Sequence, residues 1–235
     1  MVRLLLIRHG ESESDLLHVH EGRADFSLTP RGLQQAKALA TYVATHYQVD
    51  RIYTSPLRRA AQTAALLHEA TGAPQYVDDD LMEFDNGLLA GLPFAEAAVR
   101  YPKPDALPLH ASTHGQESRL AFRYRAERAL SKILSDAGEP LGEAKRTAAA
   151  AGEPGSNSAP EQAESKRDRT VAIVSHGGMI NRMYHCFLRL PVDTDLLFPT
   201  ADTGLHEWTI AEGARRIVRA NYHDHTQTLS HTETP

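Results

Sequence analysis

Two histidines stand at matching points of the chain, each just after a short apolar stretch and just before a glycine. His9 lies in the sequence RHG at residues 8–10, and His176 lies in SHGG at residues 175–178. An imidazole keeps a free lone pair near neutral pH, because its unperturbed pKa is about 6.5. The arginine beside His9 carries a planar cation that suits bidentate binding of phosphate. These residue types indicate a nucleophile and a cation that could act on one bound anion.

The apolar stretches before the two histidines predict the elements that position them. Residues 4–7 (LLLI) and 171–174 (VAIV) are continuous apolar runs. Such runs are typical of strands buried on both faces of a parallel sheet. Open α/β sheets bind ligands at the carboxyl ends of their strands. We therefore expect His9 and His176 to meet at one edge of a sheet.

The rest of the chain alternates between helical and extended patterns. The pairs Thr29-Pro30 and Ser55-Pro56 each read as an N-cap followed by proline at the first helical position. We expect one helix from the Thr29 cap to Tyr47 and another from the Ser55 cap to Gly72, with further helices over 94–100, over 116–135 and from 178 onward. Further strands are expected at 50–54, 75–81, 205–210 and 216–220. This order predicts an α/β three-layer sandwich, with a mostly parallel central sheet, helices on both faces and an antiparallel edge strand.

Composition narrows the classes of partner and compartment. The chain has 235 residues and a net charge of −5, which gives no reason to expect nucleic-acid or membrane binding. One cysteine, Cys186, excludes an internal disulfide and fits a reducing compartment. We find neither a signal-peptide pattern nor an apolar run near the roughly 18 residues of a membrane span. The expectation is a cytoplasmic protein.

Two segments differ from the folded pattern. Residues 135–168 hold one large apolar residue, Leu141, and cannot bury enough surface to offset the entropy of ordering. We interpret them as a flexible, low-complexity insertion, a neutral linker rather than a lid, in a single domain over 1–235; residues 143–151 could form a short helix. The tail, 223–235, is polar. Its histidines lack the carboxylate or cysteine spacing of a metal site, and we expect it to be solvated.

Four separated motifs resemble those of the histidine phosphatase superfamily, in its phosphoglycerate-mutase-like branch. The sequence RHGES at 8–12 resembles its signature, and SPLRRAAQTA at 55–64 resembles its second motif. The resemblance implies a phosphohistidine on His9, with Arg8 and Arg59 as phosphate ligands and His176 as a donor to the phosphate. Without the family, Arg58 and Arg59 could not be told apart. Ser12 would add a hydroxyl donor, and Gly177 would let the backbone approach the anion.

The third and fourth motifs concern the proton donor. The stretch LMEFDNGLLAG at 81–91 resembles the family segment that carries the general acid, which implies Glu83, with Asp85 as a rival. GQES at 115–118 resembles a helix entry of phosphatase members, with one residue inserted. Asp15 stands where the family often has asparagine, so we expect it to point away from the phosphate or to pair with a cation.

The resemblance implies a metal-independent phosphomonoester hydrolase that takes a small-molecule phosphoester and needs no cofactor. Two arginines and two histidines would form a cationic cup that supplies the charge metals provide elsewhere. Phosphoglycerate-mutase-type transfer is the alternative, but residues 100–118 offer only Lys103 after Arg100 for a second anionic group. A non-catalytic phosphate-binding module is the second alternative; it could keep the arginines but would not need Glu83. For each candidate site residue, the competing interpretation is a structural role; Arg8, for example, could form an ion pair with Glu11.

Overall fold

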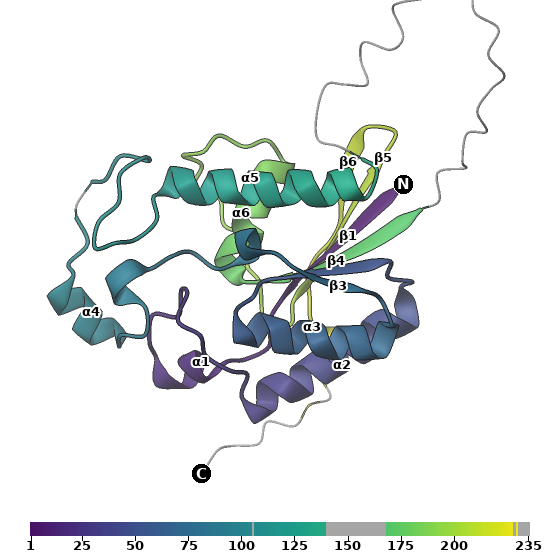
Figure 1. Cartoon of the computed structure of the whole chain (residues 1–235), viewed down its shortest axis with the longest axis horizontal. Coiled ribbons are helices and arrows are strands. Elements are labelled where there is room, and N and C mark those ends of the chain that lie inside the picture. The colour runs from purple at the N-terminus through teal and green to yellow at the C-terminus, as the bar shows by residue number, and fades with distance from the viewer. Residues whose placement is uncertain (105, 140–167, 228, 230–235) are drawn as a thin grey trace, which may run out of the picture.

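A six-stranded sheet forms the centre of the computed structural model, which describes residues 1–104, 106–139, 168–227 and 229 (Figure 1). The strands are β1 (Val2–Arg8), β2 (Arg51–Thr54), β3 (Gln75–Val77), β4 (Arg169–Ser175), β5 (Leu205–Ala211) and β6 (Ala214–Tyr222). Their order in the sheet is β3-β2-β4-β1-β5-β6. The first four are parallel, whereas β5 and β6 run antiparallel to their neighbours. The predicted antiparallel edge strand is therefore present as a pair of strands, β5 and β6.

Alternating side chains of the central strands build two hydrophobic cores. In β1, Leu4 and Leu6 join one core, whereas Leu5 and Ile7 join the other. Strand β4 divides in the same way, since successive residues of a strand point to opposite faces. Burial on both faces explains why these strands are continuously apolar.

Helices cover both faces of the sheet. Helices α2 (Pro30–His46) and α3 (Arg58–Thr71) cover one face, and α5 (Arg119–Asp136) and α6 (Gly177–Phe187) cover the other. Two shorter helices, α1 (Glu13–Leu17) and α4 (Phe94–Arg100), lie together beside one end of the sandwich (Figure 1). The predicted three-layer α/β fold is confirmed. Among the described residues, no helix is long and apolar enough to cross a bilayer.

Several local predictions need correction. Thr29 caps α2 as expected, with its side chain accepting a hydrogen bond from the Gly32 N–H. Ser55 does not cap α3, because the helix begins later and its N-cap is Leu57. Strand β3 ends at Val77, and a 3₁₀ turn at Asp79–Leu81 takes the rest of the predicted strand. The polar segment after β1 contains α1 instead of being only a loop.

The two unusual segments are described in part. Helix α5 extends through Asp136, so the first residues of the expected insertion belong to it, while residues 140–167, including the optional helix at 143–151, lie outside the described residues. In the described start of the tail, His223, Asp224 and Gln227 are exposed, whereas His225 is partly buried. His225 contacts the Thr203 hydroxyl at 3.0 Å and stacks on Tyr42, and burial lowers its pKa to about 4.

Candidate active site

The two histidines meet at the carboxyl ends of neighbouring strands. His9 follows β1 and His176 follows β4, and these strands pair in parallel with Arg8 opposite Ser175. Both rings are buried, with centroids 5.1 Å apart. The topology thus brings together two residues separated by most of the chain.

His9 is held in one orientation and one tautomer. Its Nδ1 lies 2.7 Å from the Gly10 carbonyl oxygen, and its Nε2 accepts a hydrogen bond from Arg59 Nε at 3.3 Å. The carbonyl can only accept, so the proton must sit on Nδ1 and the lone pair on Nε2. Burial, reinforced by the charges of Arg8 and Arg59, lowers the pKa of His9 well below its ordinary value. The ring is therefore neutral, with its lone pair toward Arg59.

Arg59 is fixed by the loop that follows α1. The side chain is buried in the first turn of α3, and its terminal nitrogens donate to the carbonyls of Ala24 at 2.9 Å and Gly22 at 2.8 Å. Its Nε also lies 3.1 Å from a Glu21 carboxylate oxygen. These contacts distinguish Arg59 from Arg58, which is exposed and pairs with Asp25. Of the two arginines, only Arg59 reaches His9.

Ser55 orients the second histidine. Its hydroxyl lies 2.9 Å from His176 Nε2 and accepts a hydrogen bond from the Leu57 N–H at 3.2 Å. The Ser55 hydroxyl can accept from Leu57 and donate its proton to Nε2 at the same time, and in that arrangement the His176 proton lies on Nδ1. That Nδ1 has no partner within the described part of the chain. Burial, with Arg59 next, lowers the pKa of His176 well below its ordinary value.

The Glu83 carboxylate lies at the start of α6. One oxygen accepts a hydrogen bond from the Phe84 N–H at 2.7 Å, and the other accepts from the Gly178 N–H at 2.9 Å. Asp85, the rival acid, instead pairs with Arg23 at 3.2 Å and accepts from the Gly87 N–H. Burial lowers the pKa of Arg59, and nearby negative charges oppose this effect. The charge of Glu21 opposes it most, and that of Glu83 comes next. Glu83 therefore contacts the first turn of α6, two residues after His176, whereas Asp85 is bound to Arg23 and Gly87.

Gly178 gives the carboxylate room. A Cβ at this position would lie 3.0 Å from the carboxyl carbon of Glu83 and closer still to its Oε1. Gly178→Ala should displace Glu83 and lower kcat about 10- to 100-fold, since small misplacements of catalytic groups cost about that much. Steady-state phosphatase kinetics would measure the loss. Gly213→Ala serves as a control for expression and assay, since nothing lies within 4 Å of that turn and its φ of 80° makes the alanine strained only locally, between β5 and β6. An unchanged kcat in Gly178→Ala would contradict this placement.

Arg125 holds the loop that carries Glu83. From α5, its guanidinium donates to the carbonyls of Asp80 at 2.8 Å, Met82 at 2.6 Å and Glu83 at 3.0 Å. It also pairs with Glu117 at 2.5 Å, and Glu117 in turn accepts from the Asp85 N–H. Arg125 is buried, so one charged side chain inside the protein satisfies three carbonyls of the loop that carries Glu83.

Truncating Arg125 should therefore cost stability as well as activity. Arg125→Met should lower the free energy of unfolding by about 3–5 kcal/mol, because it leaves Glu117 without its buried partner. Arg128, one turn further along α5, pairs with Asp80 on the surface, and Arg128→Met should cost at most about 1 kcal/mol. Urea unfolding of both variants would measure the difference, and equal losses would refute it.

The other predicted ligands face carboxylates of the protein itself. Arg8 pairs with Asp202 at 3.2 Å, lies 4.0 Å from Asp15, and donates to the Thr200 carbonyl. The Ser12 hydroxyl donates to Glu21 at 2.6 Å rather than facing an open cup. Gly177 occupies the first turn of α6, where a Cβ would lie 3.8 Å from Arg8. Asp15 pairs with a cation, as expected, but the predicted cationic cup is offset by carboxylates that the motifs did not include.

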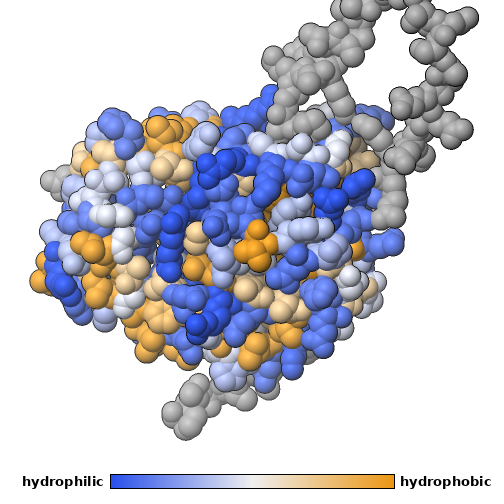
Figure 2. Space-filling view, in the orientation of Figure 1, coloured by the Kyte–Doolittle hydropathy of each residue, from blue (hydrophilic) through white to orange (hydrophobic). Residues whose placement is uncertain are grey.

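The loop that carries Glu21 is fixed against the start of α4. The His20 N–H donates to the Leu92 carbonyl at 2.9 Å, the Gly91 N–H donates back to the His20 carbonyl at 2.7 Å, and the His20 ring packs edge-on to Phe94. Exposed apolar side chains gather here: Leu16 and Leu17 on α1, and Phe94 and Val99 on α4. Figure 2 shows apolar patches over these two helices on an otherwise mainly hydrophilic face.

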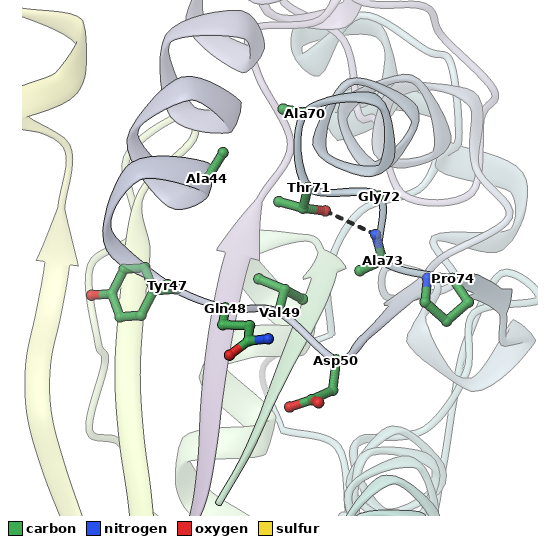
Figure 3. Close-up of a pocket in the computed structure, with 10 residues that line it drawn as sticks. All are labelled: Ala44, Tyr47, Gln48, Val49, Asp50, Ala70, Thr71, Gly72, Ala73 and Pro74. Atoms are coloured by element: carbon green, nitrogen blue, oxygen red, sulfur yellow. Dashed lines mark hydrogen bonds between the residues drawn. The ribbon is translucent and has the colours of Figure 1, made fainter.

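A pocket on another part of the protein lies far from this chemistry. Its volume is about 470 Å³, and it lies between the ends of α2 and α3. Figure 3 shows the residues that line it, with the Thr71 hydroxyl toward the Ala73 N–H. Its lining from Tyr47 to Asp50 and from Ala70 to Pro74 precedes β2 and β3, so it opens at the opposite edge of the sheet from His9. The lining has no lysine, arginine or histidine that could bind an anion. In the described ranges, no three His, Cys, Asp or Glu side chains are arranged to hold a metal.

The sheet order and the paired histidines define a protein of the phosphoglycerate-mutase-like α/β class. A family model of the histidine phosphatase superfamily (branch 1) matches residues 4–141 and 138–223. The chain therefore belongs to the histidine phosphatase superfamily, and the resemblance of its motifs is confirmed.

Similar curated proteins and a solved structure agree with this assignment. The chain is 29% identical over 232 residues to a probable phosphatase of Schizosaccharomyces pombe, covering 97% of this chain and 72% of that one. It is 42% identical over 101 residues to a bifunctional protein of Mycobacterium tuberculosis, covering 43% of this chain and only 28% of the relative. A mycobacterial glucosyl-3-phosphoglycerate phosphatase superposes with a TM-score of 0.71 at 26% identity, over 93% of this chain and 98% of the other. These findings support phosphatase activity.

Proposed function

We propose that the protein hydrolyses small-molecule phosphomonoesters through a phosphohistidine on His9. The observation that carries this proposal is the state of the imidazole: Nδ1 faces the Gly10 carbonyl, so the lone pair of Nε2 lies beside the Arg59 guanidinium. A neutral, oriented nucleophile next to a cation suits attack on phosphorus. Membership of a family with phosphatase-named relatives supports the same reaction.

In the first half-reaction, His9 displaces the alcohol. The Nε2 lone pair forms a bond to phosphorus while the ester P–O bond breaks. Glu83, in its protonated form, gives its proton to the leaving oxygen, so the product leaves as a neutral alcohol. The Nδ1 proton stays on the ring, and the Gly10 carbonyl stabilises the phosphorylated imidazolium that results.

In the second half-reaction, water reverses the roles. The Glu83 carboxylate takes a proton from water as its oxygen attacks phosphorus, and the P–Nε2 bond breaks. Inorganic phosphate leaves, His9 returns to its neutral form, and Glu83 is protonated for the next cycle. The scheme requires no metal ion or cofactor at any step.

The remaining side chains stabilise charge on the transferred phosphoryl group. Arg59, held by the Gly22 and Ala24 carbonyls, faces the oxygens beside His9. His176 donates from Nδ1, the atom that Ser55 leaves free, and Arg8 with the Gly177 N–H completes the binding site. Ser12 acts through Glu21, to which its hydroxyl donates, rather than by direct contact.

A panel of phosphoesters tests this function. Phosphoserine, glucosyl-3-phosphoglycerate and α-ribazole phosphate suit the panel, because relatives are named as phosphatases of these compounds. Release of inorganic phosphate would be measured with and without a chelator. Steady hydrolysis without bisphosphoglycerate supports a phosphatase. Rapid interconversion of phosphoglycerates with little phosphate release would instead identify a mutase, and binding without turnover a non-catalytic module.

A further inference from the structure

One carboxylate already contacts the groups assigned to the substrate phosphate. Oε1 of Glu21 lies 3.1 Å from Arg59 Nε and 2.6 Å from the hydroxyl oxygens of Ser12 and Ser14. Its Oε2 lies 3.6 Å from His9 Nε2, the proposed attacking atom. The Glu21 side chain therefore borders the space in which phosphorus must sit, and its oxygens will be close to those of any bound phosphate.

The charges around this space are already balanced before a substrate arrives. Arg59 pairs with Glu21, and Arg8 pairs with Asp202 and Asp15. His9 and His176 are neutral, because burial lowers both pKa values. Three other carboxylates, Glu83, Asp25 and Asp15, also interact electrostatically with Arg59. Glu11 is among the carboxylates that interact in this way with Asp202. A phosphate dianion would add two negative charges to a site with no net positive charge to offset them.

The backbone around Glu21 does not move aside easily. The carbonyl of Gly22 holds Arg59, and the N–H and carbonyl of His20 are both bonded to the segment before α4. The carboxylate itself accepts two serine hydroxyls. A bound phosphate must therefore share the site with Glu21, and two anionic oxygens can lie at hydrogen-bond distance only when a proton lies between them.

We propose that Glu21 is a specificity-determining residue that makes the site take phosphoesters in their singly protonated form. This proposal rests on the proposed function, in which phosphate binds between His9 and Arg59. The P–OH group of a monoanionic ester donates to the Glu21 carboxylate. A dianionic ester binds only by taking up one proton, which is shared between a phosphate oxygen and Glu21.

The consequence is an acid-shifted activity profile. The second ionisation of a phosphate ester lies near pH 6, so the monoanion falls about tenfold for each pH unit above that value. The kcat/KM of the wild-type enzyme should fall as the fraction of monoanionic ester falls. Glu21→Gln offers an amide that can donate to a dianion, so its kcat/KM should fall less steeply than that of wild type, because only the loss of the Glu83 proton, which both proteins share, then lowers it.

A matched control is available in Glu11. Its side chain is 17% exposed, compared with 18% for Glu21, and it accepts from Thr29 and lies near Arg31 without contacting His9 or Arg59. Glu11→Gln removes the same charge from the same neighbourhood. If the net negative charge near the site alone set the pH dependence, Glu11→Gln and Glu21→Gln would have the same pH profile.

The test combines kinetics with calorimetry. The kcat/KM for phenyl phosphate would be measured from about pH 6 to about pH 8 for wild type, Glu21→Gln and Glu11→Gln. The ratio of Glu21→Gln to wild type should rise at least about tenfold across this range, whereas that of Glu11→Gln should stay constant. Binding of inorganic phosphate near pH 8, in buffers of different ionisation enthalpy, should show uptake of about one proton by wild type and almost none by Glu21→Gln.

Specific results would overturn the proposal. Phosphate binding by wild type near pH 8 without proton uptake would do so, and this measurement needs no variant to fold. Equal pH profiles for Glu21→Gln and wild type, or the same shift in Glu11→Gln, would also do so. Proton-linked phosphate binding without any turnover would leave this inference standing and refute the hydrolase function instead.

Discussion

Replacing His9 with alanine is expected to lower kcat for phosphomonoesters on the order of 10⁴- to 10⁶-fold, the scale of loss when a covalent nucleophile is removed. The described part of the cup offers no ready substitute. His176 is held through Nε2 by Ser55, and the remaining side chains near Arg59 are carboxylates and serine hydroxyls. Water could attack directly, but without a covalent intermediate the full barrier must be crossed in one step.

Covalent trapping makes this prediction specific to His9. Wild-type enzyme quenched during turnover of a radiolabelled ester should carry acid-labile, alkali-stable phosphate, and digestion should locate it on the peptide that contains His9. The His9→Ala variant should carry none. His68→Ala is a matched control, since the Nδ1 of His68 also contacts a backbone carbonyl, that of Ala73 at 2.8 Å, but the residue lies near the far end of α3. If His9→Ala hydrolysed esters as fast as wild type, the mechanism proposed here would be lost.

The fold was predictable because strong local signals agreed with the tertiary structure. The apolar runs of β1 and β4 are buried on both faces, and the Thr29 cap forms the hydrogen bond that its sequence predicts. Since the two strands are parallel neighbours, their following histidines had to meet. The position of Arg59 in the first turn of α3 came from the second motif rather than from helical periodicity.

The parts of the site that escaped prediction depend on contacts between distant segments. Glu21 lies in a polar stretch without periodicity, and nothing in the sequence shows that its loop folds back onto Arg59. Ser55 gave a cap signal but acts on His176, because α3 starts two residues later than the proline suggested. Arg125 offered one usable signal: it lies three residues after Phe122, on the stripe that α5 buries.

Charge was the property that sequence motifs described least well. The motifs gather arginines and histidines, which suggested a cationic cup. The structure pairs each arginine with a carboxylate from a segment outside the motif core, Glu21 for Arg59 and Asp202 for Arg8. Short-range motifs record which groups touch the ligand, whereas the net field depends on every charge within several ångströms. This is why pH dependence, more than residue identity, is the informative property for testing the proposed function of this protein.

Replacing Glu83 with glutamine is expected to lower kcat about 10²- to 10⁴-fold, the usual contribution of a general acid–base. The amide keeps the shape of the side chain but cannot give a proton to the leaving oxygen or take one from water. Both carboxylate oxygens accept backbone N–H groups, from Phe84 and Gly178, so the amide nitrogen must also face one of these donors. The loss should therefore include some displacement of the side chain.

The leaving group separates the two roles of Glu83. A nitrophenolate leaves without protonation, so phosphorylation of His9 by a nitrophenyl ester should survive in Glu83→Gln, and alkyl esters should lose far more. Water must still be deprotonated in the second half-reaction, so the variant should accumulate phosphohistidine with the nitrophenyl ester. Asp85→Asn tests the rival acid: Asp85 is paired with Arg23, and its loss should cost less than about tenfold in kcat. A larger effect in Asp85→Asn than in Glu83→Gln, with the same dependence on leaving group, would assign the proton donor to Asp85.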